Sequence, residues 1–172
     1  MQFDGTRVTV WLAVLAYVVS LAMGWARRRG SNHSDRRAEQ WQRALWTAGC
    51  LLTVVHVLFA FAEYHHWSHR AAYAHTAQVT AEKVGVAWGG GLYFNYLFLL
   101  IWTADVVWWW CWRDAYVARP RGIAWFVHLY LAFIVFNATV VFGAAPIRYA
   151  TLVAVPVVGL AVFWVRLREP PG

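Results

Sequence analysis

The chain has 172 residues, of which 61% are hydrophobic and 13% are charged. This apolar fraction exceeds what the core of a soluble domain of this size needs, so the surplus must face lipid, which excludes an ordinary soluble fold. The net charge of +7 does not indicate a nucleic-acid partner, because the arginines lie between apolar runs, where they act as topology signals.

The sequence contains five apolar runs, each bounded by charged residues. A helix needs about 20 residues to cross the hydrocarbon core of a bilayer, and each run approaches that length. We therefore expect an all-α fold, a polytopic transmembrane helix bundle with about five spans in a single domain, 1–172. In chain order the predicted spans are 8–26, 44–62, 92–112, 122–142 and 146–167, and residues 63–91 form one outer helical connection.

The first run could instead be a cleaved signal peptide. Signal peptides carry their basic residues before the apolar stretch and a small-residue cleavage site after it. Here the basic cluster, Arg27 to Arg29, follows the apolar stretch. The sequence therefore predicts a retained first helix.

The distribution of positive charge predicts the orientation. Cytoplasmic connections of membrane proteins are enriched in Arg and Lys. With the amino terminus outside, most of the 15 basic residues fall in inner segments, and only four fall outside: Arg7, Arg70, Lys83 and Arg148. Most of the 13 tryptophans lie near the ends of the runs, as in the aromatic belts of membrane proteins. We expect a multi-pass protein of a cell inner membrane, with a cytoplasmic carboxyl terminus.

The outer connection predicts a helix of its own over Ala71–Val84, a stretch without Pro or Gly. This helix would lie along the membrane interface or extend the second span. Three consecutive glycines, Gly89 to Gly91, then allow the backbone to turn into the third span.

A cluster of imidazoles and one carboxylate lies at the outer end of the second predicted span. Its members are Glu63, His65, His66, His69 and His75. If the second helix continues through the cluster, His65 and His69 lie one turn apart on one face, a spacing at which two imidazoles can hold one metal ion. Imidazole and carboxylate suit zinc, copper or iron. The alternative is that these side chains bind only headgroups, water and backbone carbonyls.

The string His65-His66-x-x-His69 also resembles one fragment of the histidine boxes of membrane di-iron desaturases and hydroxylases. That resemblance implies several boxes on the cytoplasmic face and more histidines than the seven in this chain. The shortage of ligands makes a di-iron centre the less favoured interpretation.

Among the polar side chains inside the predicted spans, four stand out as costly to place in hydrocarbon: His56, Asp105, His128 and Asn137. Their burial in hydrocarbon is costly, so each should face another helix or water. At about 1.5 Å per residue, Asp105 and His128 reach the same depth on neighbouring helices and could pair, either as a packing contact or as a proton, ion or quinone site. A haem on His56 is disfavoured, because His128 lies too far away in depth to bind the same iron.

Several segments, taken together, resemble a family of small bacterial multi-span membrane proteins rich in Trp and His. The segments are His56, Tyr64–His69, Trp88–Tyr96, Asp105–Trp110 and Phe136–Thr139. The resemblance implies that the outer connection and the third span form one recurring unit. It implies no activity and no role for any residue.

Three functions follow as hypotheses. The first is transition-metal binding by the outer His/Glu cluster. The second is a non-catalytic accessory role, in which the Trp-rich helices pack in a larger membrane complex or a homo-oligomer. The third is a proton-, ion- or quinone-linked protein that uses Asp105 and His128. The sequence contains no nucleophile with an adjacent base and no phosphate loop, and it leaves open whether the protein is an enzyme.

Overall fold

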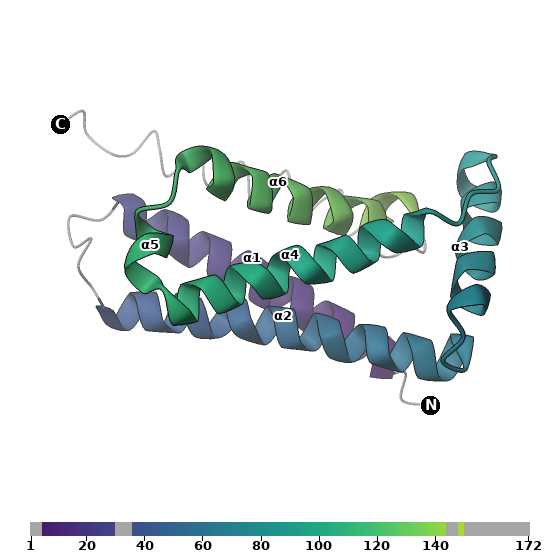
Figure 1. Cartoon of the computed structure of the whole chain (residues 1–172), viewed down its shortest axis with the longest axis horizontal. Coiled ribbons are helices and arrows are strands. Elements are labelled where there is room, and N and C mark those ends of the chain that lie inside the picture. Colours follow the sequence, from purple (N-terminus) through teal and green to yellow (C-terminus); the bar gives the residue numbers. More distant parts are fainter. Residues whose placement is uncertain (1–4, 30–35, 144–147, 150–172) are drawn as a thin grey trace. The chain divides into compact units, whose positions relative to one another are not determined.

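The computed structural model describes residues 5–29, 36–143 and 148–149, and every element within them is helical (Figure 1). The elements are α1 (Gly5–Arg29), α2 (Arg36–His65), α3 (His69–Val84), α4 (Gly91–Cys111), α5 (Arg113–Val117), α6 (Arg121–Phe136) and a π-helix, η1 (Asn137–Val141). This order confirms the predicted all-α fold.

Within the described residues, four helical stretches are long and apolar enough to cross a membrane. They are Val8–Arg27, Arg36–His65, Gly91–Cys111 and Arg121–Val141. These stretches match the first four predicted spans, so the protein is a multi-pass membrane protein. The predicted fifth span, 146–167, lies outside the described residues except for Arg148 and Tyr149.

The second helix extends well beyond its predicted apolar span. It begins at Arg36 instead of residue 44, because a polar first turn with Glu39 near the positive end of the helix dipole is favourable. The extra turns carry Arg36, Glu39 and Arg43 beyond the apolar run.

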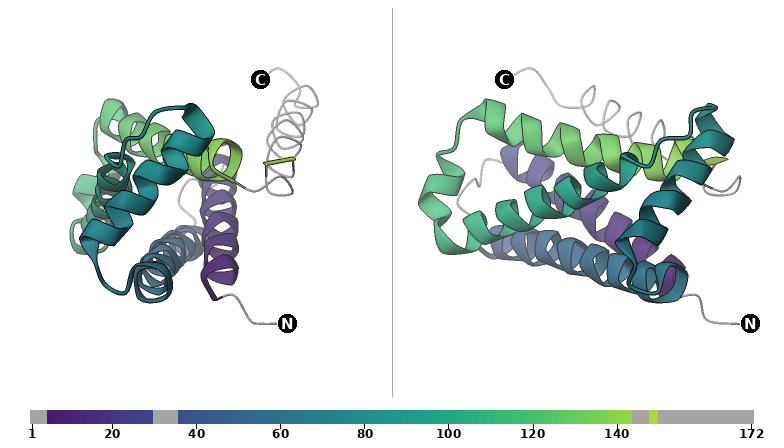
Figure 2. Two further views of the ribbon diagram at one scale, coloured as in Figure 1. Left: turned by 90° about the vertical axis from the view of Figure 1, so that its right-hand side faces the viewer. Right: turned by 45° about the vertical axis from the view of Figure 1, so that its right-hand side comes forward.

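The chain forms two compact units, Met1–Leu131 and Ala132–Gly172. In the first unit, α1 and α2 run antiparallel side by side and α4 packs against α2 (Figures 1 and 2). The centre of this unit is aromatic, with Trp46 of α2 and Trp102 of α4 at a ring-centroid distance of 5.2 Å and Tyr17 of α1 at 5.7 Å from each. The prediction of a single domain over the whole chain stays a prediction.

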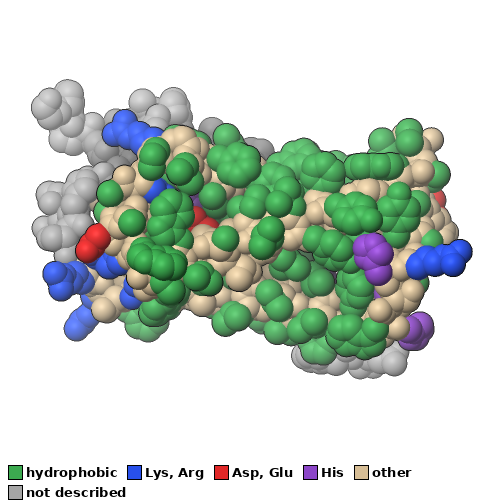
Figure 3. Space-filling model, viewed as in Figure 1, with side chains coloured by type: hydrophobic (Ala, Val, Ile, Leu, Met, Phe, Trp, Pro, Cys, Tyr) green, Lys and Arg blue, Asp and Glu red, His purple; other side chains and the backbone are tan. Residues whose placement is uncertain are grey.

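Large apolar side chains are exposed along the middle of the helices. Leu15, Leu51 and Leu100, for example, are 59 to 65% exposed. A soluble protein rarely exposes apolar side chains continuously along several helices, whereas spans in lipid do so as a rule. Figure 3 shows this apolar surface between two polar ends.

The two polar ends of the first unit differ in composition (Figure 3). One end, which we call the arginine end, holds the carboxyl end of α1, the first turns of α2, and α5 with the loop after it. The other, the histidine end, holds the junction of α2 with α3. In Figure 1, α3 crosses steeply over the ends of α2 and α4. It therefore does not extend the second span.

Helix α3 confirms the predicted helix over Ala71–Val84 and begins two residues earlier, at His69. The hydroxyl oxygen of Ser68 accepts a hydrogen bond from the backbone N–H of Ala71 at 3.2 Å, which caps the new helix. The predicted turn into α4 also forms. A Cβ at Gly89 would lie 2.5 Å from the carbonyl oxygen of Tyr73, so only glycine fits there.

In the second unit, polar side chains bond to the backbone of their own chain segment. The Asn137 side chain donates to the carbonyl of Phe133, and the Thr139 hydroxyl donates to that of Val135, both at 2.8 Å. Such local bonds satisfy a polar group within a span. Asn137 therefore finds its partner within its own helical segment.

Candidate functional site

A strained turn shapes the histidine end. Helix α2 ends at His65, and the next two residues, His66 and Trp67, have positive φ values of 47° and 60°. The backbone N–H of Ser68 donates to the carbonyl of His65 at 2.8 Å, which closes the turn. Positive φ is uncommon for residues other than glycine and costs about 1 kcal/mol or more. This turn redirects the chain so that α3 passes back over the end of α2.

The turn brings His65 and His75 together. Their ring centroids are 5.4 Å apart, although the residues belong to different helices. His65 is half-buried and packs the edge of its ring against Phe61 at 5.5 Å, whereas His75 is exposed. One ring is thus held by packing, and the other can approach it from the solvent side.

His69 lies in a different environment. Its Nδ1 atom is 3.0 Å from the hydroxyl of Tyr96, and its ring packs against Tyr93 and Tyr96 at 5.9 Å each. The predicted one-turn pairing of His65 with His69 required α2 to continue through the cluster. Because α2 ends at His65, the two histidines lie on different helices.

The remaining members of the predicted cluster lie apart. The carboxylate of Glu63 accepts a hydrogen bond from the Thr6 hydroxyl at 2.9 Å, which joins α2 to the start of α1. His66 is exposed in the turn. Among the described residues, which include all five members of the cluster, no three His, Cys, Asp or Glu side chains form a group arranged to hold a metal ion. The structure brings together only His65 and His75.

His56 has a structural contact at the same end. Its Nδ1–H donates to the backbone carbonyl of Thr6 at 2.8 Å, so the Nδ1 atom carries the proton. Thr6 is buried and contacts α2 twice. Its carbonyl oxygen accepts from His56, and its hydroxyl donates to Glu63. These bonds tie the first turn of α1 to the neighbouring span.

At the arginine end, Asp105 is buried and fully paired. Its carboxylate forms an ion pair with Arg119 at 2.5 Å and accepts hydrogen bonds from the Trp46 indole at 3.0 Å and the Tyr116 hydroxyl at 2.9 Å. The side chains of Asp105 and Arg119 are only 2% and 8% exposed. Burial, together with the charge of Asp105, raises the pKa of Tyr116, so its hydroxyl stays protonated and donates.

Aromatic rings hold this ion pair in place. The guanidinium of Arg119 lies 3.8 Å from the Tyr116 ring centroid, and the Tyr116 ring also stacks on Trp109 at 4.7 Å. His128 packs the edge of its ring against Trp46 at 5.4 Å. Asp105 and His128 thus both contact Trp46, and a direct pair between them stays a prediction.

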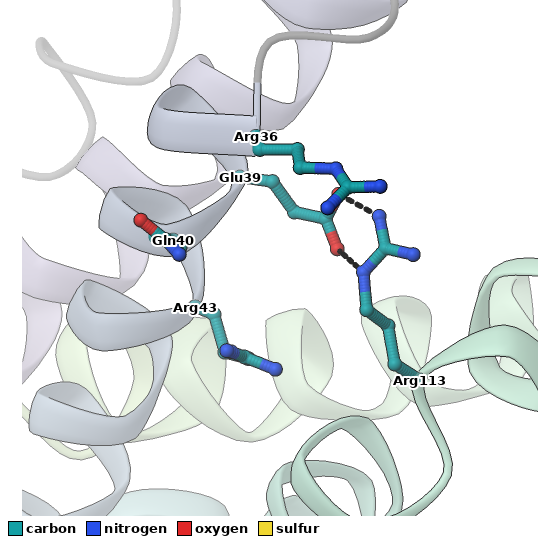
Figure 4. Close-up of a pocket in the computed structure, with 5 residues that line it drawn as sticks. All are labelled: Arg36, Glu39, Gln40, Arg43 and Arg113. Carbon is teal, nitrogen blue, oxygen red and sulfur yellow. Dashed lines mark hydrogen bonds and ion pairs between the residues drawn. The ribbon is translucent and has the colours of Figure 1, made fainter.

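A second polar cluster at the arginine end centres on Glu39. Its carboxylate accepts two hydrogen bonds from Arg113, at 2.8 and 2.7 Å, and lies 3.4 Å from Arg27. The bonds to Glu39 raise the pKa of Arg113. Beside them opens a pocket of about 220 Å³, lined by Arg36, Glu39, Gln40, Arg43 and Arg113 (Figure 4).

Sequence reasoning did not single out the partners at the arginine end. Arg119, Tyr116 and Glu39 were not among the candidate site residues that the sequence indicated. One signal was available for Glu39. An acid that lies among many arginines has a strong electrostatic reason to be paired.

Comparison with known proteins adds no constraint on these sites. No protein-family model, no curated protein and no solved structure matches this chain. Function is therefore inferred from the chemistry of the two polar ends.

Proposed function

We propose that the protein binds a divalent transition-metal ion at the histidine end, through His65 and His75. The observation that supports this proposal is the 5.4 Å distance between their ring centroids. With metal–nitrogen bonds of about 2.0 to 2.1 Å and tetrahedral angles, the centroids of two ligating imidazole rings lie about 5 Å apart.

The two-histidine arrangement favours an exchanging ion over a structural one. Structural zinc sites are closed by four protein ligands, whereas two imidazoles leave coordination positions for water or a further ligand. Imidazole binds zinc, copper and iron, and the affinity order of divalent metals favours Cu²⁺ and Zn²⁺. We therefore expect the protein to handle the ion, by capture or transfer, at the membrane surface.

Metal titration of the detergent-purified protein tests the proposal. The wild type should bind one Zn²⁺ or Cu²⁺ per chain, and His65→Ala or His75→Ala should each weaken binding by at least about tenfold, since each removes one of two protein ligands. Calorimetry gives the affinity, and nitrogen hyperfine splitting in the spectrum of bound Cu²⁺ counts the imidazoles. Acidification should also weaken binding, because only neutral imidazole coordinates a metal.

Two other histidines of the same segment supply matched controls. His66→Ala and His69→Ala remove the same chemical group, but the first side chain is exposed in the turn and the second contacts Tyr96. Both should keep the wild-type affinity within about twofold. Equal losses in all four variants, or no stoichiometric metal in the wild type, would contradict a site built from His65 and His75.

We further propose that the histidine end faces the outside of a bacterial inner membrane, with the amino terminus on the same side. The arginine asymmetry supports this orientation, and the bond from Thr6 to Glu63 keeps the first turn of α1 at the histidine end. In intact cells, an impermeant thiol reagent should label a Gln78→Cys chain on the exposed surface of α3. It should reach the exposed native Cys111 at the other end only after permeabilisation, and the reverse pattern would exclude this orientation.

A further inference from the structure

The pocket beside Glu39 carries more positive charge than its own carboxylate neutralises. Three guanidinium groups line it, from Arg36, Arg43 and Arg113, against the single carboxylate of Glu39. Figure 4 shows Arg36 and Arg43 extending from α2 toward the side on which Arg113 lies. Arg113 forms two hydrogen bonds with Glu39, so these two opposite charges neutralise each other. The positive charges of Arg36 and Arg43 remain beside the open pocket.

Within the described residues, the remaining hydrogen-bond donors of this pocket have no acceptor or only a weak one. Arg36 has no ion-pair partner among the described residues, and the Nε atom of Arg43 is buried without an acceptor among them. The third donor nitrogen of Arg113 lies 3.3 Å from Asp114, whose side chain is 98% exposed, so that ion pair is weak. Guanidinium donors held in this way match the oxygen atoms of a phosphate group.

Packing of Arg43 fixes part of the pocket before any ligand arrives. Its guanidinium lies 3.9 Å from the ring centroid of Trp110, and its Nη1 donates to the carbonyl of Trp109 at 3.5 Å. An arginine stacked on an aromatic ring loses less freedom when it binds an anion. The volume of about 220 Å³ exceeds the roughly 30 Å³ that one water occupies by enough to admit a phosphate with several waters.

The pocket lies at the level of the lipid headgroups. It is built from the first turns of α2 and the junction of α4 with α5, where the apolar spans end. Trp41 and Trp112, one on each of these segments, are both 62% exposed, and exposed tryptophans at the ends of spans mark the membrane interface. Basic pockets between spans at this level bind the phosphate groups of anionic lipids.

We propose that the pocket lined by Arg36, Arg43 and Arg113 binds a phosphate group, carried either by an anionic lipid headgroup or by free phosphate. Glu39 holds the Arg113 guanidinium in one orientation, so Arg113 forms a rigid side of the pocket. Arg36 and Arg43 supply the charge that the phosphate neutralises. This site is separate from the metal site at the histidine end and does not depend on it.

Binding of phosphatidylglycerol to the full chain in zwitterionic detergent micelles, measured by native mass spectrometry, tests the proposal. Phosphatidylglycerol should bind more tightly than phosphatidylcholine, whose choline group is repelled by the arginines. The variant Arg36→Gln should weaken binding about fivefold and Arg36→Gln/Arg43→Gln about 25-fold, from the usual contribution of one basic residue near anionic lipid. Arg36→Gln removes a side chain with no ion pair in the described structure, so it should fold normally even if the double variant does not.

Inorganic phosphate in a parallel titration distinguishes the two sources. Competition by millimolar phosphate would identify the free ion as a ligand, and its failure to compete would identify the lipid headgroup; both results support a phosphate pocket. Arg121→Gln is the matched control, because it removes an exposed arginine that does not line the pocket. Unchanged binding in Arg36→Gln and the double variant, or an equal loss in Arg121→Gln, would overturn the proposal.

Discussion

Asp105→Asn should lower the free energy of unfolding by about 3 to 5 kcal/mol, because it leaves Arg119 buried without its counter-charge. The effect is large since the side chains of Asp105 and Arg119 are both almost fully buried and their distance is 2.5 Å. The substitution also exchanges an anionic acceptor for a neutral one opposite Trp46 and Tyr116, which weakens two further hydrogen bonds. The change should appear in reversible unfolding of the purified protein in mixed micelles.

Asp114→Asn is the matched control for this experiment. Asp114 is also an aspartate paired with an arginine at the same end, but its side chain is 98% exposed, so the substitution should cost less than about 1 kcal/mol. Tyr116→Phe should fall between the two, at about 1 kcal/mol, for the loss of one hydrogen bond. If Asp105→Asn were as mild as Asp114→Asn, Asp105 would not be a structural anchor, and its use in proton or ion chemistry would become the better hypothesis.

The spans were predictable from sequence because they depend on one property, the hydrophobicity averaged over about 20 residues. Apolar length and the charges that bound it are properties of the chain alone, and the first four predicted spans correspond to helical stretches that can cross a membrane. The partners of Asp105 were not predictable in this way. Depth along a helix follows from residue number. Tyr116 and Arg119 reach Asp105, however, because the chain turns after α4, so that α5 and the loop after it lie against the end of α4.

The histidine end shows a second limit of sequence reasoning. The spacing of His65 and His69 places them on one face only in a continuous helix. The chain leaves the helix at His66 and Trp67, and neither residue type indicates positive φ as strongly as glycine or asparagine would. The contact between His65 and His75 depends on that turn and could be found only from the three-dimensional structure.

Gly49→Val should cost about 3 kcal/mol, because α2 packs closely against α4 at this residue. A Cβ at Gly49 would lie 2.9 Å from the Trp102 ring and 3.5 Å from the carbonyl oxygen of Ala13. Trp102 cannot move away easily, since Trp46, Tyr17 and Phe98 surround it at centroid distances of 5.2 to 5.7 Å. Gly49→Ala meets the same ring with a single methyl group and should cost about 1 to 2 kcal/mol.

Gly122→Ala separates this steric effect from the general effect of adding a side chain to a helix. A Cβ at Gly122 meets no atom within 4 Å, so the substitution should stabilise the protein by up to about 1 kcal/mol through helix propensity. Trp102→Phe provides a second check, because it removes the ring atoms that a Cβ at Gly49 would meet, and Trp102 donates no hydrogen bond within the described structure. The double variant Gly49→Ala/Trp102→Phe should lose about 1 kcal/mol less free energy of unfolding than the sum of the losses in the two single variants. Strict additivity, or a Gly49→Ala protein as stable as wild type, would show that α2 and α4 can separate without cost at this contact.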